Sequence, residues 1–262
     1  MSTSGKVLYI LESNKDSFSS GEEMAGQLGV SRNAVWKAIK ELREKGYMIE
    51  AVSNKGYRLS GDNDIISSEG IKACLTPGFD RAGEIFVFDS LTSTSDKAKE
   101  LAIKGAPHGT VVVAASQTGG RGRKDHSFFS PKGGLYMSIV LRPDFLFSTD
   151  SAELTSFTGK AVTEAIRELT GIEPYLGGIN DLYVDGKKVC GILLEGGSEF
   201  DSGTLQWVVA GIGINFDSDI ESFPKEVRER ASSLFTRGKA TASKNALIAR
   251  VIEKVLDCQP IQ

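Results

Sequence analysis

A glycine-rich loop with three cations is the segment of this chain best suited to chemistry. It comprises Gln117-Thr-Gly-Gly-Arg121-Gly-Arg123-Lys124 and follows an apolar run. Its glycines leave backbone N–H groups open to a ligand, and guanidinium groups bind phosphate through paired hydrogen bonds. Neither a Walker loop nor a dinucleotide-binding fingerprint has this spacing. The loop therefore predicts a site for an anionic ligand, although such a loop by itself also fits a plain surface turn.

A basic helix near the N-terminus is the second candidate site. Apolar residues recur at helical spacing from Arg32 to Lys45, and the basic residues lie on the other faces. Ser31 is the expected N-cap, and an earlier helix is expected between Ser20 and Gly29. A hairpin turning at residues 53–56 follows. Helix, turn, basic helix and hairpin in this order indicate a winged helix-turn-helix domain.

The local charge favours DNA as the partner of this domain. Residues 21–60 contain seven Lys and Arg against five Glu, whereas the whole chain has a net charge of −3. We expect the basic helix to enter a major groove and the hairpin to reach phosphates. The alternative is a solvated helix in a small helical subdomain. The expected DNA-binding residues are Ser31, Arg32, Asn33, Lys37, Lys55 and Arg58.

The rest of the chain has the pattern of an α/β domain. Apolar segments predict strands at 85–90, 110–116, 134–143, 181–186, 188–196 and 205–216. Helices are expected at 94–104, 151–170 and 243–257. The predicted organisation is a winged-helix domain at 1–62, a linker at 63–70, an α/β domain at 71–257 and a tail at 258–262.

Composition excludes several classes of protein. The chain has 262 residues, of which 40% are hydrophobic and 25% charged, as in ordinary soluble proteins. No apolar run reaches the roughly 18 residues of a membrane span, and no signal peptide is visible, so we expect a cytoplasmic protein without membrane contact. Three widely spaced cysteines and two histidines argue against a disulfide scaffold, a zinc site and a hydrolase triad.

Taken in order, the motifs resemble those of the bacterial biotin protein ligases, especially the bifunctional members that also repress the biotin operon. The resemblance covers about residues 5–257. It rests on the winged helix, Ser93-Thr94, the GRGR loop, SFFSPKGGLYMS, Asn180-Asp181, GKKVCGILLE and Gly211-Ile-Gly-Ile-Asn215. It implies an α/β fold, with a mixed sheet flanked by helices in a class II synthetase-like arrangement.

The resemblance also implies an activity and its partners. Members of this family join biotin to ATP, forming biotinyl-5′-adenylate and pyrophosphate, and then pass biotin to a lysine of a biotin carboxyl carrier domain. Biotin, ATP, Mg²⁺, the carrier domain and operator DNA are the ligands and partners that follow. Ligand binding is expected to order the loop at 117–127 and complete a homodimer surface, which places two basic helices on a symmetric operator.

Site residues follow from the matching motifs. Because the biotin carboxylate approaches the α-phosphate as anion toward anion, the site needs fixed positive charge. The implied catalytic residues are Arg121, Arg123, Asn180 and Asp181, with Asp181 holding Mg²⁺ through water. The implied biotin-binding residues are Ser93, Thr94, Gln117, Gly119, Gly120, Arg121, Tyr136, Ser138, Gly191 and Ile192. The implied nucleotide-binding residues are Arg123, Lys124, Asn180, Lys187 and Asn215.

Three positions depart from the family pattern. Ser95 replaces an asparagine, and Asp125-His126 replace a glycine and an arginine. Gly177 replaces the lysine that bridges the biotin carboxylate and the α-phosphate. Loss of one such donor costs about 3 to 4 kcal/mol, or on the order of a hundred- to a thousandfold in rate. In addition, residues 257–262 stand where family members usually continue into a small β-barrel.

These departures leave more than one function open. The first is a biotin ligase that is also a biotin-responsive repressor, which the breadth of the motifs favours. The second is a regulator that senses biotin or its adenylate without catalysis, since sensing needs only different affinities in two states. The third is a sensor of another acid such as lipoate, which SFFSPKGGLYMS and GRGR disfavour. We predict the ligase and repressor.

Overall fold

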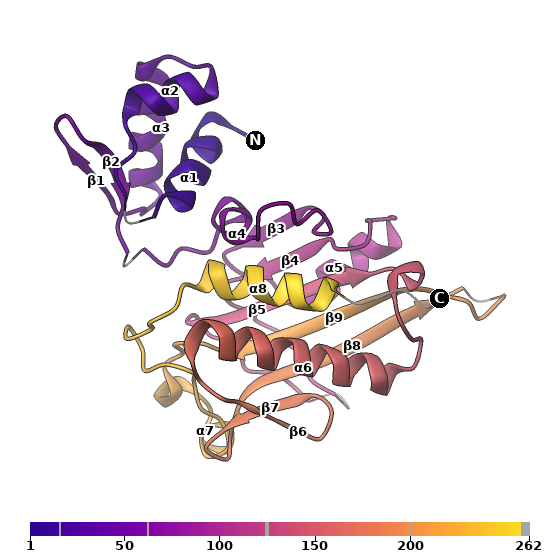
Figure 1. The fold of residues 1–262 in the computed structure, drawn as a ribbon. Helices are drawn as coiled ribbons and strands as arrows, with labels where there is room; N and C mark the ends of the chain where they lie inside the picture. The colour runs from indigo at the N-terminus through magenta and orange to yellow at the C-terminus, as the bar shows by residue number, and fades with distance from the viewer. Residues whose placement is uncertain (16, 62, 124–125, 200, 258–262) are drawn as a thin grey trace. The chain divides into compact units, whose positions relative to one another are not determined.

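The computed structural model forms two compact units (Figure 1). The first comprises Met1–Thr76 with Lys244–Ala249, and the second comprises Pro77–Ser243 with the residues from Arg250 onward. The structure describes residues 1–15, 17–61, 63–123, 126–199 and 201–257. No helix in these stretches is long and apolar enough to cross a bilayer.

The N-terminal unit has the element order expected of a winged helix-turn-helix. The Ser20 hydroxyl accepts the Glu23 N–H, and the Ser20 N–H donates to the Glu23 carboxylate, which confirms the capping box. This helix ends at Gly29 in the left-handed conformation, with φ 63°. The elements are α1 (Thr3–Ser13), α2 (Gly21–Leu28), α3 (Arg32–Glu44), β1 (Ile49–Val52) and β2 (Gly56–Leu59).

One face of α3 closes the core of this unit. Val35, Ile39 and Leu42 are buried with Leu11 of α1 and Leu59 of β2. The other face of α3 is exposed to solvent, as a helix that enters a DNA groove must be.

The hairpin β1–β2 turns tightly, and one glycine makes this possible. Gly56 has φ 104°, and a Cβ atom there would lie 2.2 Å from the Ser19 carbonyl oxygen. That oxygen also accepts the Tyr57 N–H at 2.9 Å. Only glycine therefore fits at this position, in agreement with the expected turn.

Residues 63–70 differ from the linker that the sequence predicts. Ser67 caps a further helix, α4 (Ser68–Cys74), which begins inside the expected linker. The buried Asn245 amide accepts the Ser67 N–H at 3.1 Å and donates to the Ile65 carbonyl at 3.0 Å. Lys244 forms an ion pair with Asp64 at 2.8 Å. These contacts hold the segment within the N-terminal unit, and they involve residues too distant in sequence for local patterns to indicate.

A seven-stranded mixed sheet forms the centre of the second unit, which confirms the predicted α/β class. Its order is β3-β4-β5-β9-β8-β7-β6, with only the β3–β4 pair parallel. The strands are β3 (Ile85–Phe88), β4 (Val111–Ala114), β5 (Gly134–Leu141), β6 (Tyr175–Gly177), β7 (Asp181–Val184), β8 (Lys187–Ser198) and β9 (Leu205–Asn215).

Helices cover the sheet because alternate strand residues are apolar. Val112, Val140 and Val209 face α5 (Thr94–Ile103) and pack on its alanines. The long helix α6 (Ser151–Thr170) lies across the sheet (Figure 1). Beside it lies the part of α8 (Lys244–Leu256) that belongs to this unit, in which Lys254 pairs with Glu168 of α6 at 2.6 Å. Shorter elements are α7 (Lys225–Arg228) and the 3-10 turns Pro143–Phe145 and Ile220–Ser222.

His108 makes the stability of this unit sensitive to acid. Its ring stacks on Phe145 with centroids 4.4 Å apart, and its Nδ1 accepts the Arg142 N–H at 3.2 Å. Burial, with a smaller contribution from the Arg81 charge, lowers the pKa of His108 from 6.5 to about 4. Because the unfolded chain binds this proton more readily, the neutral ring stabilises the fold above pH 6.5, and that stability is lost as the pH falls toward about 4.

We expect His108→Gln to weaken this pH dependence. The melting temperature of the wild-type protein should fall more steeply between pH 6.5 and about 4 than that of the variant, as followed by circular dichroism. His126→Gln, which replaces the exposed histidine, serves as the control and should behave like the wild type. Parallel pH profiles for wild type and His108→Gln would show that the ring titrates normally.

Candidate functional site

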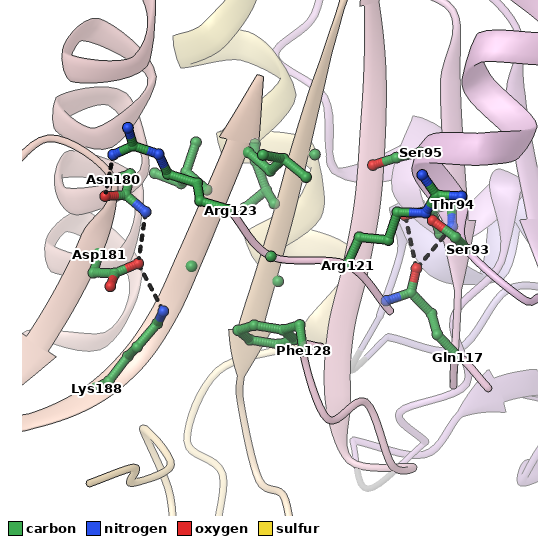
Figure 2. A pocket seen from close by; sticks show the side chains of 17 residues that line it. Ser93, Thr94, Ser95, Gln117, Arg121, Arg123, Phe128, Asn180, Asp181 and Lys188 are labelled. Carbon is green, nitrogen blue, oxygen red and sulfur yellow. Dashed lines mark hydrogen bonds and ion pairs between the residues drawn. The ribbon is translucent and has the colours of Figure 1, made fainter. Parts of the chain in front are cut away.

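A pocket on the second unit is bordered by the N-terminus of α5, the glycine-rich loop and strands β7, β8 and β9 (Figure 2). The hollow between these segments holds about 460 Å³ when the space that is open to solvent is included. Its hydroxyl side carries Ser93, Thr94, Ser95, Gln117 and Arg121, and its charged side carries Arg123, Asn180, Asp181 and Lys188. Figure 2 shows Phe128 between the two sides.

Hydrogen bonds fix the groups on the hydroxyl side. The Thr94 N–H and hydroxyl both donate to Gln117 Oε1, at 2.7 and 3.1 Å. The Gln117 amide nitrogen donates to Ser130 Oγ at 3.0 Å, so the orientation of the carboxamide is determined. Behind them, the buried Ser138 hydroxyl donates to Thr94 Oγ1 at 2.9 Å and lies 3.2 Å from Ser95 Oγ. The result is a preorganised polar wall for a neutral ligand with its own donors and acceptors.

An ion-pair network ties the glycine-rich loop to α5. Arg121 lies 3.1 Å from the Asp96 carboxylate, which also pairs with Lys99 at 3.0 Å. Burial disfavours the charged lysine, but hydrogen bonds to Glu195 and Asp96 outweigh it and raise the pKa of Lys99. The guanidinium of Arg121 is thus placed at the rim, where its half-exposed side chain can reach a ligand.

The charged side is a chain of hydrogen-bonded groups. Arg123 donates to Asn180 Oδ1 at 3.3 Å, and the Asn180 amide donates to Asp181 Oδ1 at 3.0 Å. The same Asp181 oxygen pairs with Lys188 Nζ at 2.7 Å. This side of the pocket therefore holds two cations and one carboxylate, which leaves net positive charge for a phosphate group.

Glycines form the floor beneath Phe128. Gly191 of β8 pairs with Gly213 of β9 in the sheet register. A Cβ atom at Gly191 would lie 2.9 Å from the Phe128 ring, and one at Gly213 would lie 2.7 Å from it. The absence of side chains at this pair lets an aromatic ring lie flat on the strands.

The structure brings most of the expected site residues to the pocket. Ser93, Thr94, Gln117, Arg121, Arg123, Asn180, Asp181, Gly191 and Ile192 line it. Lys124 lies outside the described residues. The remaining expected residues, Gly119, Gly120, Tyr136, Ser138, Lys187 and Asn215, do not line it.

Several of the expected residues that do not line the pocket form contacts behind its walls. Tyr136 is fully buried, and its hydroxyl donates to the Pro131 carbonyl at 2.8 Å. Burial raises the pKa of this phenol, which therefore stays protonated. The Gly119 N–H donates to the Thr92 carbonyl, and Gly120 leaves no room for a side chain beside the Phe128 carbonyl. The Asn215 amide donates to the Ser232 carbonyl at 2.9 Å.

Lys188, rather than Lys187, is the lysine of β8 in the pocket. If side chains alternated regularly along β8 from Gly191, Lys187 would lie on the face of the strand that lines the pocket. However, β8 carries a bulge opposite the Leu182–Tyr183 step, so Lys188 faces Asp181 and Lys187 is exposed. Phe128 also lines the pocket and was not among the expected residues, although its position directly after the glycine-rich loop was a usable signal.

The space in which a side chain of residue 177 would begin is already occupied. A Cβ atom there would lie 2.4 Å from the Tyr183 ring, which stacks on Tyr175 with centroids 5.6 Å apart. Gly177 is the cross-strand neighbour of Asp181, so a longer side chain at this position starts beside the charged side of the pocket. In this chain an aromatic ring therefore fills the space in which a side chain of residue 177 would begin.

The described residues hold no cluster of three or more His, Cys, Asp or Glu suited to a metal ion. Asp181 is the one carboxylate among the described residues that line the pocket. Mg²⁺ at nucleotide sites is usually held by one or two carboxylates, water and substrate phosphates. The residues present fit a cation that enters with a nucleotide.

The DNA-binding residues predicted on α3 and the hairpin are largely exposed. Arg32 lies 4.0 Å from Glu22, and its side chain is 76% exposed, so it is available to a partner. Arg58 pairs with Glu50 at 2.7 Å and lies over the Phe18 ring at 4.7 Å, which fixes its guanidinium at the hairpin. Ser31 caps α3 through the Ala34 N–H. The other expected residues, Asn33, Lys37 and Lys55, are exposed.

Comparison with known proteins places both units in one family. Residues 87–215 match the biotin/lipoate A/B protein ligase family, and residues 4–58 match a helix-turn-helix domain. The bifunctional ligase/repressor BirA of Bacillus subtilis is 40% identical over 243 residues, which cover 92% of this chain and 72% of that protein. The chain belongs to the bifunctional biotin ligase/repressor family.

Other members and their structures agree with this assignment. The BirA protein of Escherichia coli is 31% identical over 215 residues, covering 80% of this chain and 62% of that protein. The biotin protein ligase of Aquifex aeolicus, solved with biotin and ATP, has a TM-score of 0.56 and 29% identity over 66% of this chain and 69% of its own. The predicted fold, with a winged helix ahead of a ligase domain, is thereby confirmed.

Proposed function

We propose that this biotin ligase/repressor forms biotinyl-5′-adenylate in its pocket, transfers biotin to a lysine of a biotin carboxyl carrier domain, and represses transcription as an adenylate-promoted homodimer on operator DNA. The observation that carries the ligase proposal is the cation arrangement: Arg121, Arg123 and Lys188 surround a pocket with a preorganised hydroxyl wall. A neutral ring system suits the wall, and an anionic group suits the cations. We also propose a cytoplasmic location, because ATP and operator DNA are both expected partners of the protein.

In the first step, a biotin carboxylate oxygen attacks the α-phosphorus of ATP and pyrophosphate leaves. Thr94 and Gln117 hold the biotin ring on the hydroxyl side of the pocket. Arg123 and Lys188 offset the negative charge where carboxylate and phosphate meet. Mg²⁺, when bound with ATP, supplies further charge neutralisation, and Asp181 is the residue that would hold it through water. Asn180 holds the side chains of Asp181 and Arg123 in fixed positions relative to each other.

In the second step, the amine of the carrier lysine attacks the biotinyl carbonyl carbon and AMP leaves. In this proposal Arg121 and Arg123 of the glycine-rich loop contact the adenylate phosphate until the carrier arrives. Gly119 and Gly120 let the loop pass close to Thr92 and Phe128. Tyr136, Ser138 and Asn215 hold the strands under the ligand.

A non-catalytic biotin sensor is the second candidate function, and Gly177 favours it. The two candidates differ in whether the protein makes its own adenylate. Adding a purified carrier domain to protein preloaded with biotin and MgATP separates them, because only a ligase yields biotinylated carrier by mass spectrometry. A carrier that stays unmodified while the protein binds biotin would favour the sensor.

Arg123→Ala should raise the off-rate of biotinyl-5′-adenylate about ten- to a hundredfold, the effect of losing hydrogen bonds to a charged group. Stopped-flow chase with unlabelled adenylate measures this rate. Arg167→Ala, on the exposed face of α6, is the control and should leave the off-rate unchanged. Equal off-rates for wild type and Arg123→Ala would show that Arg123 does not contact the adenylate.

The repressor proposal requires that ligand promotes dimerisation. Sedimentation velocity with and without biotinyl-5′-adenylate should show the dimer forming at a lower protein concentration when the adenylate is bound. An unchanged monomer fraction would contradict the proposed regulation, although it would leave the ligase proposal intact.

A further inference from the structure

The DNA-facing side of α3 carries one large apolar side chain, Trp36. Its exposed fraction is 53%, although a tryptophan is usually buried. The core of the unit takes Val35, Ala38 and Ile39 from this helix, and Trp36 is not one of its buried members. An exposed aromatic residue by itself is ordinary, and its meaning depends on what surrounds it.

Trp36 stands within the basic stripe of α3. Arg32 lies one turn before it and Lys40 one turn after it, and both side chains are exposed, at 76% and 64%. Asn33, also exposed, lies three residues before it on the same side of the helix. An apolar ring flanked by two cations matches a DNA groove, in which phosphates border the edges of the bases.

The hairpin extends this surface. A hollow beside α3 is lined by Arg32, Asn33 and Trp36 from the helix and by Asn54 and Lys55 from the turn of the hairpin. The tryptophan thus lies in a hollow of the N-terminal unit that also carries the cations Arg32 and Lys55 and the carboxylate of Glu22. The alternative, a solvated helix in a small helical subdomain, gives no reason for an exposed tryptophan between cations in a hollow.

The side chains on this surface suit different parts of the DNA. Arginine and lysine contacts to phosphate give affinity but carry no sequence information. Asparagine can pair with adenine, and an apolar side chain distinguishes thymine by its 5-methyl group. Trp36 is the large apolar residue exposed on this helix among the described residues.

We propose that Trp36 is a specificity-determining residue of the repressor, which covers a thymine 5-methyl group in the major groove of the operator. This inference rests on the proposed DNA-binding function of α3. It separates Trp36, which selects sequence, from Arg32 and Lys40, which attract DNA of any sequence. The predicted consequence is that loss of the ring relaxes specificity more than it weakens non-specific binding.

Selection from random-sequence duplex DNA tests this division. Full-length wild type, Trp36→Ala and the control Tyr9→Ala, which truncates an exposed aromatic residue of α1, are each saturated with synthetic biotinyl-5′-adenylate. The bound DNA is then sequenced. We expect wild type and Tyr9→Ala to enrich the same motif, and Trp36→Ala to lose the preference for thymine at one position of each half-site.

Replacing that thymine with deoxyuridine isolates the methyl group. Wild-type affinity should fall about fourfold, the effect of one buried methyl group, while the affinity of Trp36→Ala should not change. Non-specific affinity and its salt dependence should be equal in both proteins. Thermal melts confirm that Trp36→Ala is folded.

Two results overturn the inference, and they are distinguishable. If Trp36→Ala enriches the full wild-type motif, or responds to deoxyuridine as the wild type does, Trp36 does not contact the base and the repressor function stands. If the wild type enriches no motif, both the repressor proposal and this inference fail.

Intrinsic fluorescence gives an independent readout, because the chain contains two tryptophans, Trp36 and Trp207. In a Trp207→Phe variant all the tryptophan emission comes from Trp36. Selected DNA should quench this emission and shield it from iodide. Unchanged iodide quenching in the complex would show that the ring remains in solvent and would overturn the contact.

Discussion

Lys188→Met should slow biotin-dependent pyrophosphate release by about a hundred- to a thousandfold, the effect of removing one preorganised charge from a transition state. Lys188 Nζ lies 2.7 Å from the Asp181 carboxylate on the charged side of the pocket. Because Gly177 supplies no bridging cation, Lys188 and Arg123 carry most of the positive charge there. Methionine is an unbranched side chain that keeps most of the length of lysine and lacks its ammonium group.

The adjacent lysine is a matched control. Lys187→Met removes the same charge one residue away, from an exposed position outside the pocket, and should change the rate less than twofold. Pyrophosphate release is followed by a coupled assay with saturating biotin and MgATP. Equal rates for the two variants, or a larger loss in Lys187→Met, would show that the pocket is not where the nucleotide reacts. Thermal melts check that Lys188→Met is folded, since it leaves Asp181 without its ion-pair partner.

Gly177→Lys should raise the rate of adenylate formation, by on the order of a hundredfold if the restored ammonium group reaches the reacting carboxylate. Gly177 has no positive φ, so its backbone accepts a side chain. The obstacle is the Tyr183 ring, which lies 2.4 Å from the position of a Cβ atom. Tyr183 is partly exposed and stacks on the exposed Tyr175, so it can swing outward.

Gly177→Ala separates the effect of the cation from that of the displaced ring. It adds the Cβ atom and moves Tyr183, but it brings no charge, and its rate should stay near that of the wild type. Pre-steady-state measurement of pyrophosphate reports the chemical step directly. A Gly177→Lys rate at or below the Gly177→Ala rate would mean that other residues already fill the role of the bridging lysine.

Local signals made most of the N-terminal unit predictable. The capping pair Ser20 and Glu23, the C-cap Gly29 and the turn residue Gly56 each act through contacts within a few residues or through their own φ, so they are visible in sequence. The structure confirms all of them. Helix α4 was not predicted, because the segment that leads into it is held by Asn245, which is 178 residues away from Ser67 in the sequence.

The pocket was predictable in its motifs but not in its details. Residues that reach it from the loop and from the start of α5, such as Arg121 and Thr94, follow directly from the order of the motifs. The choice between Lys187 and Lys188 depends on one bulge in β8, and a bulge shifts the facing of every residue beyond it. Phe128 reaches the pocket by lying on glycines of two other strands, and that contact depends on how these strands pair.

Formation of biotinyl-5′-adenylate tests the central claim most directly. Purified full-length protein is mixed with biotin and MgATP without any acceptor, released pyrophosphate is measured, and the bound ligand is identified by mass spectrometry. We expect pyrophosphate release that depends on biotin and matches the amount of protein, with biotinyl-5′-adenylate bound to it. Binding of biotin or of added adenylate without pyrophosphate release would contradict a ligase and leave a sensor.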